Sequence, residues 1–453
     1  MYQHFHSQAA LLPGGWARDV LISVDGNGVI RSVRAEQAAP TGASILPGPV
    51  LAGMTNVHSH AFQRLMAGLA ERPGGGEDSF WSWRERMYAL VARLTPEQVQ
   101  AIAHYLYVDM LKAGYTAVAE FHYLHHDADG RAYAEPAEMG LRVAAAARQA
   151  GLPITLLPVL YSYGGFGERP ASAAQRRFLN DDAGFVELLE RLRARLDGGQ
   201  RLGVAFHSLR AVSAAQMRRV LAVLDDSHPV HIHIAEQQGE VDECLAWSAQ
   251  RPVAYLLQRF AIDARWCLIH ATHIDDDECD ALARSGACVG LCPTTEASLG
   301  DGLFPAQRFL GAGGAVAIGS DSHVSLSVAE ELRWLEYGQR LWSQRRNRLH
   351  DGGDVGSYLY RQAAGGGARA AGQPTGALRA GARADFVVLD GDHPMLAGCR
   401  PAQSASRWLF SGDNGWVREV WIAGRCVVAD GRHAQEEEAG RAFAAVAEDL
   451  IRD

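Results

Sequence analysis

Residues 229–236 read PVHIHIAE, a short apolar run that ends in histidine and glutamate side chains. Its β-branched residues and its length favour a strand over a helix. Seven similar runs occur along the chain, separated by segments whose apolar residues have helical spacing. These seven runs are residues 50–58, 115–121, 153–160, 202–207, 265–270, 287–292 and 315–321. Strands and helices therefore alternate through most of the sequence.

This alternation predicts the fold class. Apolar runs of this length, each followed by a helix, indicate parallel strands that are buried on both faces of a sheet. Eight such units between residues 50 and 321 fit an α/β fold of the (β/α)8, or TIM-like, barrel type. One helix is marked by its start, because Thr95 can cap it, Pro96 takes its first position and Gln98 follows three residues after the cap.

The two ends of the chain differ from its middle. Residues 17–34 predict two strands joined by an Asp-Gly-Asn-Gly turn, and residues 376–429 contain further short strands with glycine turns. We expect both ends to form one small β-sandwich beside the barrel. The predicted organisation is residues 1–49 for the first part of the sandwich, 50–375 for the catalytic barrel, and 376–453 for the second part with a terminal helix.

The composition excludes several classes of protein. The 453 residues carry a net charge of −9, whereas a dedicated nucleic-acid binder needs a basic stripe. No stretch approaches the ~18 apolar residues of a membrane span, and the start of the chain lacks the features of a signal peptide. The seven cysteines are odd in number and form no CxxC pair. We expect a cytoplasmic protein that acts on a small molecule, without nucleic-acid or membrane partners.

Histidine pairs end two of the predicted strands. His58 and His60 close the first strand in the motif HSH, and alternate residues of a strand point to the same side. Both imidazoles should face the mouth of the barrel, where they are suitable ligands for zinc. At the fifth strand His233 precedes Glu236, whose carboxylate can carry a proton between a water molecule and a leaving nitrogen. His231 is interpreted as an interior residue with a structural hydrogen bond.

Two further strands end in the same way. His270 ends the sixth predicted strand in LIHATH, and Asp321 ends the eighth in GSDS. Active sites of such barrels lie at the C-terminal ends of the strands. Chance is a poor explanation for so many potential metal ligands at these ends, so we interpret them as one catalytic site.

Taken together, the motifs HSH, HIHIAE, LIHATH and GSDS resemble the amidohydrolase superfamily over nearly the whole chain. This resemblance implies that the metal ligands are His58, His60, His233 and Asp321. It also implies that Glu236 is the general acid/base. The other two catalytic residues, His270 and Asp321, would orient the attacking water.

A single lysine bears on the number of metals. Superfamily members with two metals bridge them through a carboxylated lysine, or a glutamate, near the end of strand three or four. Lys112, the only lysine, precedes the second predicted strand. Strands three and four end in Leu160-Tyr161 and His207-Ser208, which offer no bridging carboxylate. We therefore expect one divalent metal per chain, with zinc preferred, as in the deaminase branch that releases ammonia from C=N groups.

Three segments, HSHAFQRLMAG, FWSWRERM and EFHYLHH, resemble the formimidoylglutamate deiminases of histidine degradation. Those enzymes convert N-formimino-L-glutamate and water to N-formyl-L-glutamate and ammonia. Because a guanidinium group pairs bidentately with a carboxylate, a substrate with two carboxylates calls for arginine partners. We expect Arg84 and Arg210 to supply them, although the neighbouring Arg86 could replace Arg84. The polar residues expected to complete the pocket are Gln63, Tyr123 and His207.

Other polar residues receive structural interpretations. Arg64 is read as a structural or rim residue. The cluster of His122, His125 and His126 has no carboxylate at ligand spacing on its strand. We expect these three histidines to lie at the surface or behind the site.

Two alternatives stay open. An aromatic-base deaminase, such as one that acts on guanine, would share the metal site but need an aromatic, amide-lined pocket without two arginines. A non-catalytic barrel kept as a binding module would typically have lost metal ligands, which this chain retains together with Glu236. For the assembly, we expect a homodimer.

Overall fold

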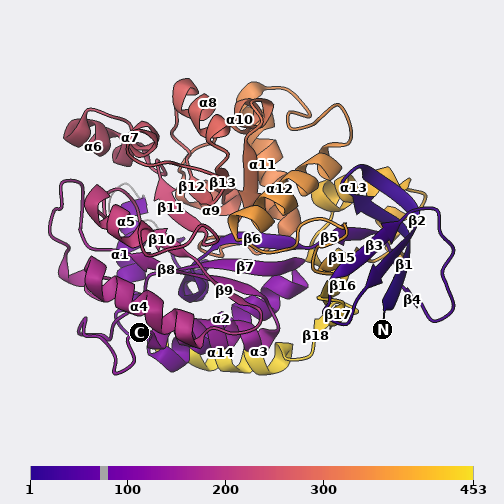
Figure 1. Ribbon diagram of the computed structural model, residues 1–453, viewed down its shortest axis with the longest axis horizontal. Coiled ribbons are helices and arrows are strands. Elements are labelled where there is room, and N and C mark those ends of the chain that lie inside the picture. Colours follow the sequence, from indigo (N-terminus) through magenta and orange to yellow (C-terminus); the bar gives the residue numbers. More distant parts are fainter. Residues whose placement is uncertain (1, 72–79, 452–453) are drawn as a thin grey trace.

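The computed structural model describes residues 2–71 and 80–451, which contain two nine-stranded sheets (Figure 1). One sheet rolls into a barrel surrounded by helices. The other combines strands from both ends of the chain and lies at the right of Figure 1. This architecture confirms the predicted (β/α)8 barrel with a small terminal β-domain.

Eight parallel strands form the barrel in their order along the chain. They are β6 (Met54–Ser59), β7 (Tyr115–His122), β8 (Ile154–Leu160), β10 (Val204–Phe206), β11 (Val230–Ile234), β12 (Trp266–His270), β13 (Cys288–Leu291) and β14 (Ala315–Ile318), with β9 (Gln200–Leu202) beside β8. The barrel closes where Ser59 pairs with Asp321. There, Asp321 N donates to the His58 carbonyl (3.0 Å), and His60 N donates to the Asp321 carbonyl (3.1 Å).

Glycines divide two of the runs that were predicted as single strands. In the run 50–58, β5 (Val50–Ala52) pairs within the terminal sheet and the barrel strand starts at Met54. A Cβ atom on the intervening Gly53 would lie 2.1 Å from Thr116 Oγ1, so only glycine fits. Gly203 likewise separates β9 from β10, since a Cβ atom there would lie 2.8 Å from the Pro229 carbonyl oxygen. The chain therefore passes from the terminal sheet into the barrel at Gly53.

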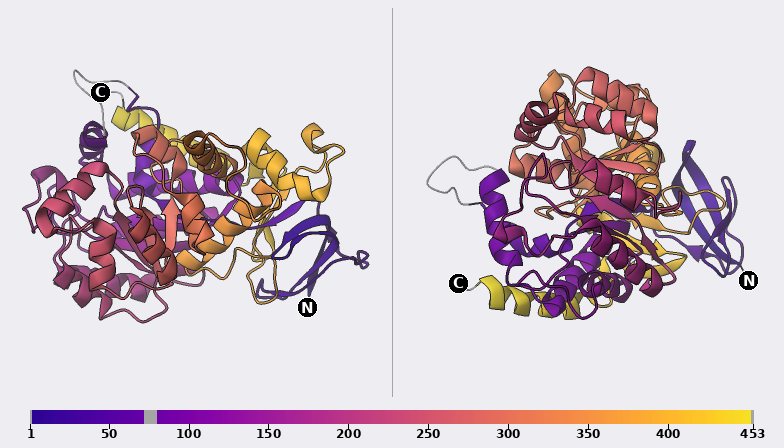
Figure 2. Two further views of the ribbon diagram at one scale, coloured as in Figure 1. Left: turned by 90° about the horizontal axis from the view of Figure 1, so that it is seen from above. Right: turned by 60° about the vertical axis from the view of Figure 1, so that its left-hand side comes forward.

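Helices cover the outside of the barrel (Figure 2). Helix α2 (Pro96–Lys112) begins as predicted, because the side chain of Thr95 accepts from Gln98 N while that of Gln98 accepts from Thr95 N. The other helices of this layer are α1 (Phe80–Val91), α3 (Glu138–Ala150), α4 (Asp182–Arg195), α5 (Ala214–Leu221), α6 (Gln238–Ser248), α7 (Pro252–Arg259), α8 (Asp276–Ser285), α9 (Pro293–Leu299), α10 (Ala306–Gly311), α11 (Val328–Ser343), α12 (Val355–Ala370) and α13 (Ser404–Ser411).

The end of α12 lies against the N-terminal ends of the barrel strands. Thr155 Oγ1 donates to the Ala371 carbonyl (2.7 Å), and His231 Nε2 donates to the Ala370 carbonyl (2.8 Å). A Cβ atom on Gly366 would lie 2.0 Å from the Val316 carbonyl oxygen. Gly366, in the segment GGGARAAG, therefore allows the helix to approach the strands closely.

The terminal sheet has the order β18-β17-β16-β15-β5-β1-β2-β3, with β4 paired to β1. Its strands are β1 (Gln3–Leu12), β2 (Gly15–Val24), β3 (Ile30–Arg34), β4 (Ser44–Ile45), β5, β15 (Phe386–Leu389), β16 (Val417–Ile422), β17 (Arg425–Ala429) and β18 (Arg432–His433). The strands predicted within residues 17–34 are β2 and β3. Strand β5 joins the two chain ends, because it pairs with β1 on one side and β15 on the other.

The last helix, α14 (Glu436–Ile451), leaves this sheet and packs against the barrel, as the yellow helix beside α2 and α3 in Figure 1. The ring of Phe443 stacks on Tyr105 at 4.4 Å between centroids. Lys112 forms an ion pair with Glu436 (2.9 Å). The chain therefore ends on the barrel, away from its own start.

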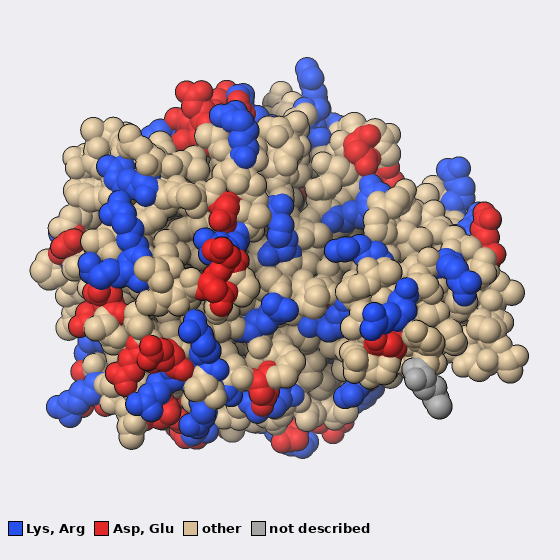
Figure 3. Space-filling model, viewed as in Figure 1, with Lys and Arg blue, Asp and Glu red and all other residues tan. Residues whose placement is uncertain are grey.

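The surface carries both signs of charge. On the face shown in Figure 3, acidic and basic side chains are interspersed. Among the described residues, no helix has both the length and the apolar character that crossing a membrane requires.

Candidate active site

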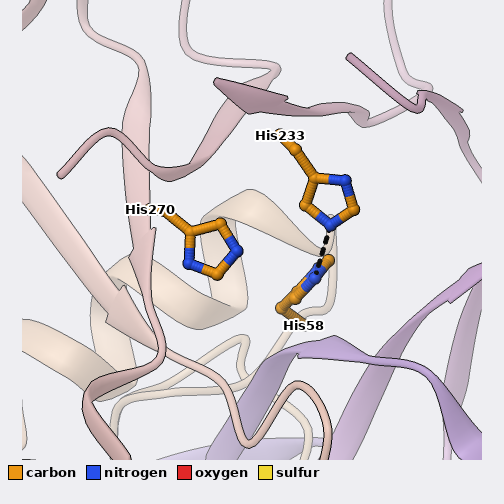
Figure 4. Close-up of side chains that lie close together, drawn as sticks. All are labelled: His58, His233 and His270. Atoms are coloured by element: carbon orange, nitrogen blue, oxygen red, sulfur yellow. Dashed lines mark hydrogen bonds between the residues drawn. The ribbon is translucent and has the colours of Figure 1, made fainter. Parts of the chain in front are cut away.

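A cavity at the C-terminal ends of the barrel strands brings the predicted site residues together. Its walls include ten of the eleven residues predicted from the sequence: His60, Gln63, Arg84, Tyr123, His207, Arg210, His233, Glu236, His270 and Asp321. The eleventh, His58, is fully buried, and its Nε2 lies 3.0 Å from Nε2 of His233 (Figure 4). The other wall residues are Trp83, Met87, Tyr88, Tyr161, Gly164, Phe178, Ser208, Thr295 and Leu299.

Three imidazoles and one carboxylate converge at the floor of the cavity. Asp321 Oδ1 lies 3.5 Å from His58 Nε2 and 3.3 Å from His60 Nε2. In a tetrahedral zinc site with ligand distances of about 2.1 Å, neighbouring donor atoms are about 3.4 Å apart. The spacing of these atoms, including the 3.0 Å between His58 and His233, therefore suits one divalent metal.

The ring nitrogens that point away from this centre set the tautomers. His60 Nδ1 donates to the Phe121 carbonyl (2.8 Å), and His233 Nδ1 donates to the His207 carbonyl (2.9 Å). Each neutral ring then presents the lone pair of Nε2 to the centre, as metal ligands require. Burial lowers the pKa of His58, His60 and His233, which keeps these rings neutral. The donor set therefore fits a divalent metal in chemistry as well as in spacing.

His270 and Glu236 lie beside this centre. His270 Nε2 is 3.8 Å from Glu236 Oε1 and 3.7 Å from Asp321 Oδ2. Burial raises the pKa of Glu236 to about 7, which suits a group that must both accept and donate a proton near neutral pH. Burial also lowers the pKa of His270, but the carboxylates of Glu236, Asp321 and Glu296 outweigh it and raise that pKa to about 10.

The sequence analysis expected Asp321 to end a strand, but it does not. Strand β14 stops at Ile318, and Asp321 follows with a φ of 48°. His270 (φ 67°), Ala235 (φ 50°) and His323 (φ 61°) also have left-handed backbones. Such strained conformations of non-glycine residues concentrate at functional sites, and here they direct the chain inward after it leaves the strands.

Arg84 and Arg210 reach the cavity from opposite parts of the sequence, on α1 and after β10. Both guanidinium charges act on His207, whose pKa burial and Arg210 lower well below its usual value. Both also act on Tyr88, and the Arg84 guanidinium carbon lies 5.6 Å from the centre of its ring. The cavity therefore contains two cations around one histidine.

The structure distinguishes Arg84 from its neighbour. Arg86 Nη1 donates to the Ala70 carbonyl (2.7 Å) and is absent from the cavity wall. Arg64 is structural, as expected, because it donates to the His323 carbonyl (2.7 Å) and pairs with Asp109 (3.5 Å). Gln63 Nε2 donates to the hydroxyl of Tyr123 (2.8 Å), which places both side chains in one wall.

Two histidines of the cluster at the end of β7, His122 and His125, do not lie at the surface, whereas His126 is partly buried. His122 and His125 are buried, and burial lowers their pKa values to about 4 and about 3. His125 donates to the Val159 carbonyl (3.0 Å) and His126 to the Leu179 carbonyl (2.7 Å). Of the two positions expected from the sequence, the surface is therefore excluded for His122 and His125, and a position behind the site stays possible.

Sequence reasoning missed the residues that support the cluster of potential metal ligands. Glu120, buried within β7, accepts from Ser59 Oγ (2.5 Å), Ala61 N (2.6 Å) and Tyr107 OH (3.0 Å). Glu120 thereby holds Ser59 and Ala61, the residues before and after His60. His323 Nδ1 lies 2.8 Å from Ser320 Oγ and its Nε2 lies 3.2 Å from Ser59 Oγ. The sequence did contain a signal for Glu120, because a glutamate inside the apolar run YTAVAEF is unusual.

A family model described as "Amidohydrolase family" matches residues 50–427, which is most of the chain. The chain belongs to the amidohydrolase family. A second model, the N-terminal domain of formimidoylglutamate deiminase HutF, matches residues 3–44 of this amidohydrolase.

Several known proteins resemble this amidohydrolase over nearly its full length. A formimidoylglutamate deiminase from Pseudomonas aeruginosa is 58% identical over 98% of this chain and 99% of its own. A 5-methylthioadenosine/S-adenosylhomocysteine deaminase from Haloarcula marismortui is 28% identical over 84% of this chain and 82% of its own. The crystal structure of an amidohydrolase from Brucella melitensis has 49% identity and a TM-score of 0.95, over 99% of this chain and 100% of that one. A zinc-bound adenosine deaminase from Xanthomonas campestris shares the fold, with 22% identity and a TM-score of 0.79 over 99% and 97% of the chains.

Proposed function

We propose that this amidohydrolase hydrolyses N-formimino-L-glutamate to N-formyl-L-glutamate and ammonia, the formimidoylglutamate deiminase reaction of histidine degradation. The observation that carries the proposal is the cavity itself, which combines a metal-ligand cluster with two arginines. The 58% identity to a formimidoylglutamate deiminase over 98% of the chain supports it. Although aromatic rings also line the cavity, a neutral purine would have no use for two guanidinium groups.

The ligands proposed for the metal are His58, His60, His233 and Asp321, and the proposed metal is one zinc ion per chain. When bound there, a divalent cation lowers the pKa of a water molecule toward neutrality and so supplies a nucleophile. Lys112 pairs with Glu436 outside the barrel and offers no bridge to a second metal.

The proposed catalytic residues position the attacking water and move its proton to the leaving nitrogen. His270 and Asp321 orient the attacking water toward the formimino carbon. Glu236 takes a proton from this water and delivers it to the terminal nitrogen, because its raised pKa of about 7 allows both steps. The tetrahedral intermediate then carries a hydroxyl and an amino group on the same carbon. Glu236 transfers the hydroxyl proton to this amino group, the carbon–nitrogen bond breaks, and ammonia leaves behind a formyl group.

The proposed substrate-binding residues hold the glutamate part. Arg84 and Arg210 would bind the two carboxylates, because a charge-assisted contact supplies orientation as well as affinity. Gln63, Tyr123 and His207 complete the pocket wall. Held in this way, the substrate keeps its glutamate nitrogen farther from the metal ligands than its terminal nitrogen.

An ammonia-release screen with the zinc-loaded protein tests this assignment. Formiminoglutamate should release ammonia, whereas guanine and adenine should not. Release from a purine but not from formiminoglutamate would overturn the substrate and favour the aromatic-base deaminase.

We also propose a homodimer in the cytoplasm. One chain has a mass of 49.0 kDa, and multi-angle light scattering of the purified protein should give twice this value. A monomer in that measurement would refute the dimer.

A further inference from the structure

A carboxylate outside the cavity lies directly behind His270. Glu296, on α9, is 6% exposed, and its Oε1 lies 3.2 Å from His270 Nδ1. The same oxygen accepts a hydrogen bond from Cys292 N (2.9 Å). The opposite ring nitrogen of His270 faces the carboxylates of Glu236 and Asp321 at 3.8 Å and 3.7 Å. The imidazole is therefore held between a buried acceptor and the reacting groups.

This arrangement has a consequence for the ring of His270. An ionised carboxylate can only accept hydrogen bonds, so the nitrogen that contacts Glu296 has to carry the proton. The carboxylate of Glu296 is itself held in place, because it accepts from the backbone N–H of Cys292, the N-cap residue of α9. A second partner of this kind sets the tautomer and the direction of an imidazole.

We propose that Glu296 is a positioning residue for the reaction: it holds the Nδ1–H of His270 and so keeps Nε2 directed at the attacking water. This proposal rests on the proposed function only in its kinetic test, which measures the rate of the proposed reaction. Glu296 itself is not part of the cavity wall, so a substrate bound in the cavity should not contact it. Its effect on catalysis should therefore pass entirely through His270.

The first test is a double-mutant cycle on the zinc-loaded enzyme. Glu296→Ala should keep its metal and its KM while kcat falls by about 10–100-fold, the usual effect of losing an outer hydrogen-bond partner. In a His270→Asn background, the same change should cause no further loss. Additive losses, or an unchanged kcat for Glu296→Ala, would overturn the proposal.

Two further variants separate positioning from folding and from charge. Glu296→Gln keeps an acceptor oxygen, so it should stay close to wild type; a loss as large as that of Glu296→Ala would contradict the proposal. Glu331→Gln is the matched control, because this buried carboxylate accepts from Thr294 N (3.0 Å) on the same helix. It should lower stability but leave kcat unchanged.

The second test needs no substrate, so it stands even where the proposed function fails. Imidazole ¹⁵N NMR of the zinc-loaded protein, with His270 assigned by its loss in His270→Asn, should show a protonated Nδ1 in the wild type. In Glu296→Ala the Nδ1 signal should shift toward the unprotonated position. An unprotonated Nδ1 in the wild type would refute the assigned role.

Discussion

At the scale of single residues, burial makes Glu236 suitable for proton transfer. Glu236→Gln removes the exchangeable proton but leaves every proposed metal ligand in place. We predict that the variant keeps its metal while kcat falls by ~10² or more. Metal analysis and steady-state kinetics check this. Asp242→Asn, an exposed residue on the adjacent helix α6, is the control and should not change kcat. Normal turnover by Glu236→Gln would mean that another group carries the proton.

The two cavity arginines can be compared with Arg86, which lies on the same helix α1 as Arg84. Arg84→Met and Arg210→Met each remove a proposed carboxylate contact, which is worth about 1.5–3 kcal/mol for a charged hydrogen bond. We predict a corresponding loss of kcat/KM on formiminoglutamate and little change on formiminoglycinamide, which lacks carboxylates. Arg86→Met removes the bond to the Ala70 carbonyl instead and should leave both substrates unaffected. Equal effects of the Arg84 and Arg86 changes would contradict the assignment.

The sequence predicted which residues meet in the cavity better than it predicted what supports them. His60, His233 and Asp321 were predictable because strand ends share one face of a barrel. Glu296 and His323 were not. Glu296 contacts His270, and His270 and His323 both have left-handed backbones, which direct their side chains in ways that the sequence pattern does not show. Strain of this kind has no signature in hydrophobic periodicity.

At the scale of elements, the packing of helix α12 against the barrel strands can be tested. A Cβ atom on Gly366 would lie 2.0 Å from the Val316 carbonyl oxygen, whereas one on Gly365 would meet nothing within 4 Å. We predict that Gly366→Ala destabilises by about 1–3 kcal/mol through overpacking. Gly365→Ala should be neutral or stabilising by up to about 1 kcal/mol, because alanine favours the helix. Thermal unfolding measures both, and similar Tm values for the two variants would contradict the close approach.

Eight strands were predictable from apolar runs, but two of their boundaries were not. A run such as residues 50–58 is continuous in hydropathy, while Gly53 turns the chain from one sheet into the other. Strand β1 was not predicted at all, because its sequence QHFHSQAALL alternates too weakly. Pairing across hundreds of residues decides its conformation, and local pattern does not report such partners.

At the scale of the whole molecule, the metal should stabilise the fold. The proposed ligands come from two strands, β6 and β11, and from the segments that follow β6 and β14, so one ion would join parts of the chain far apart in sequence. We predict one divalent metal per chain by elemental analysis, with activity and Tm both lowered on chelation. At about 1,000 times the Kd, bound metal stabilises by about 4 kcal/mol. Two stoichiometric metals in the active protein would refute the single-metal site.

The most direct test of the proposed reaction is identification of its products. Formiminoglutamate can be cleaved to ammonia and N-formylglutamate, or to formamide and glutamate. Because the two arginines should hold the glutamate nitrogen away from Glu236, the terminal bond should break. Proton NMR with an ammonia assay on the zinc-loaded protein should therefore show N-formylglutamate and ammonia in equal amounts. Formamide and glutamate as the products would contradict the account.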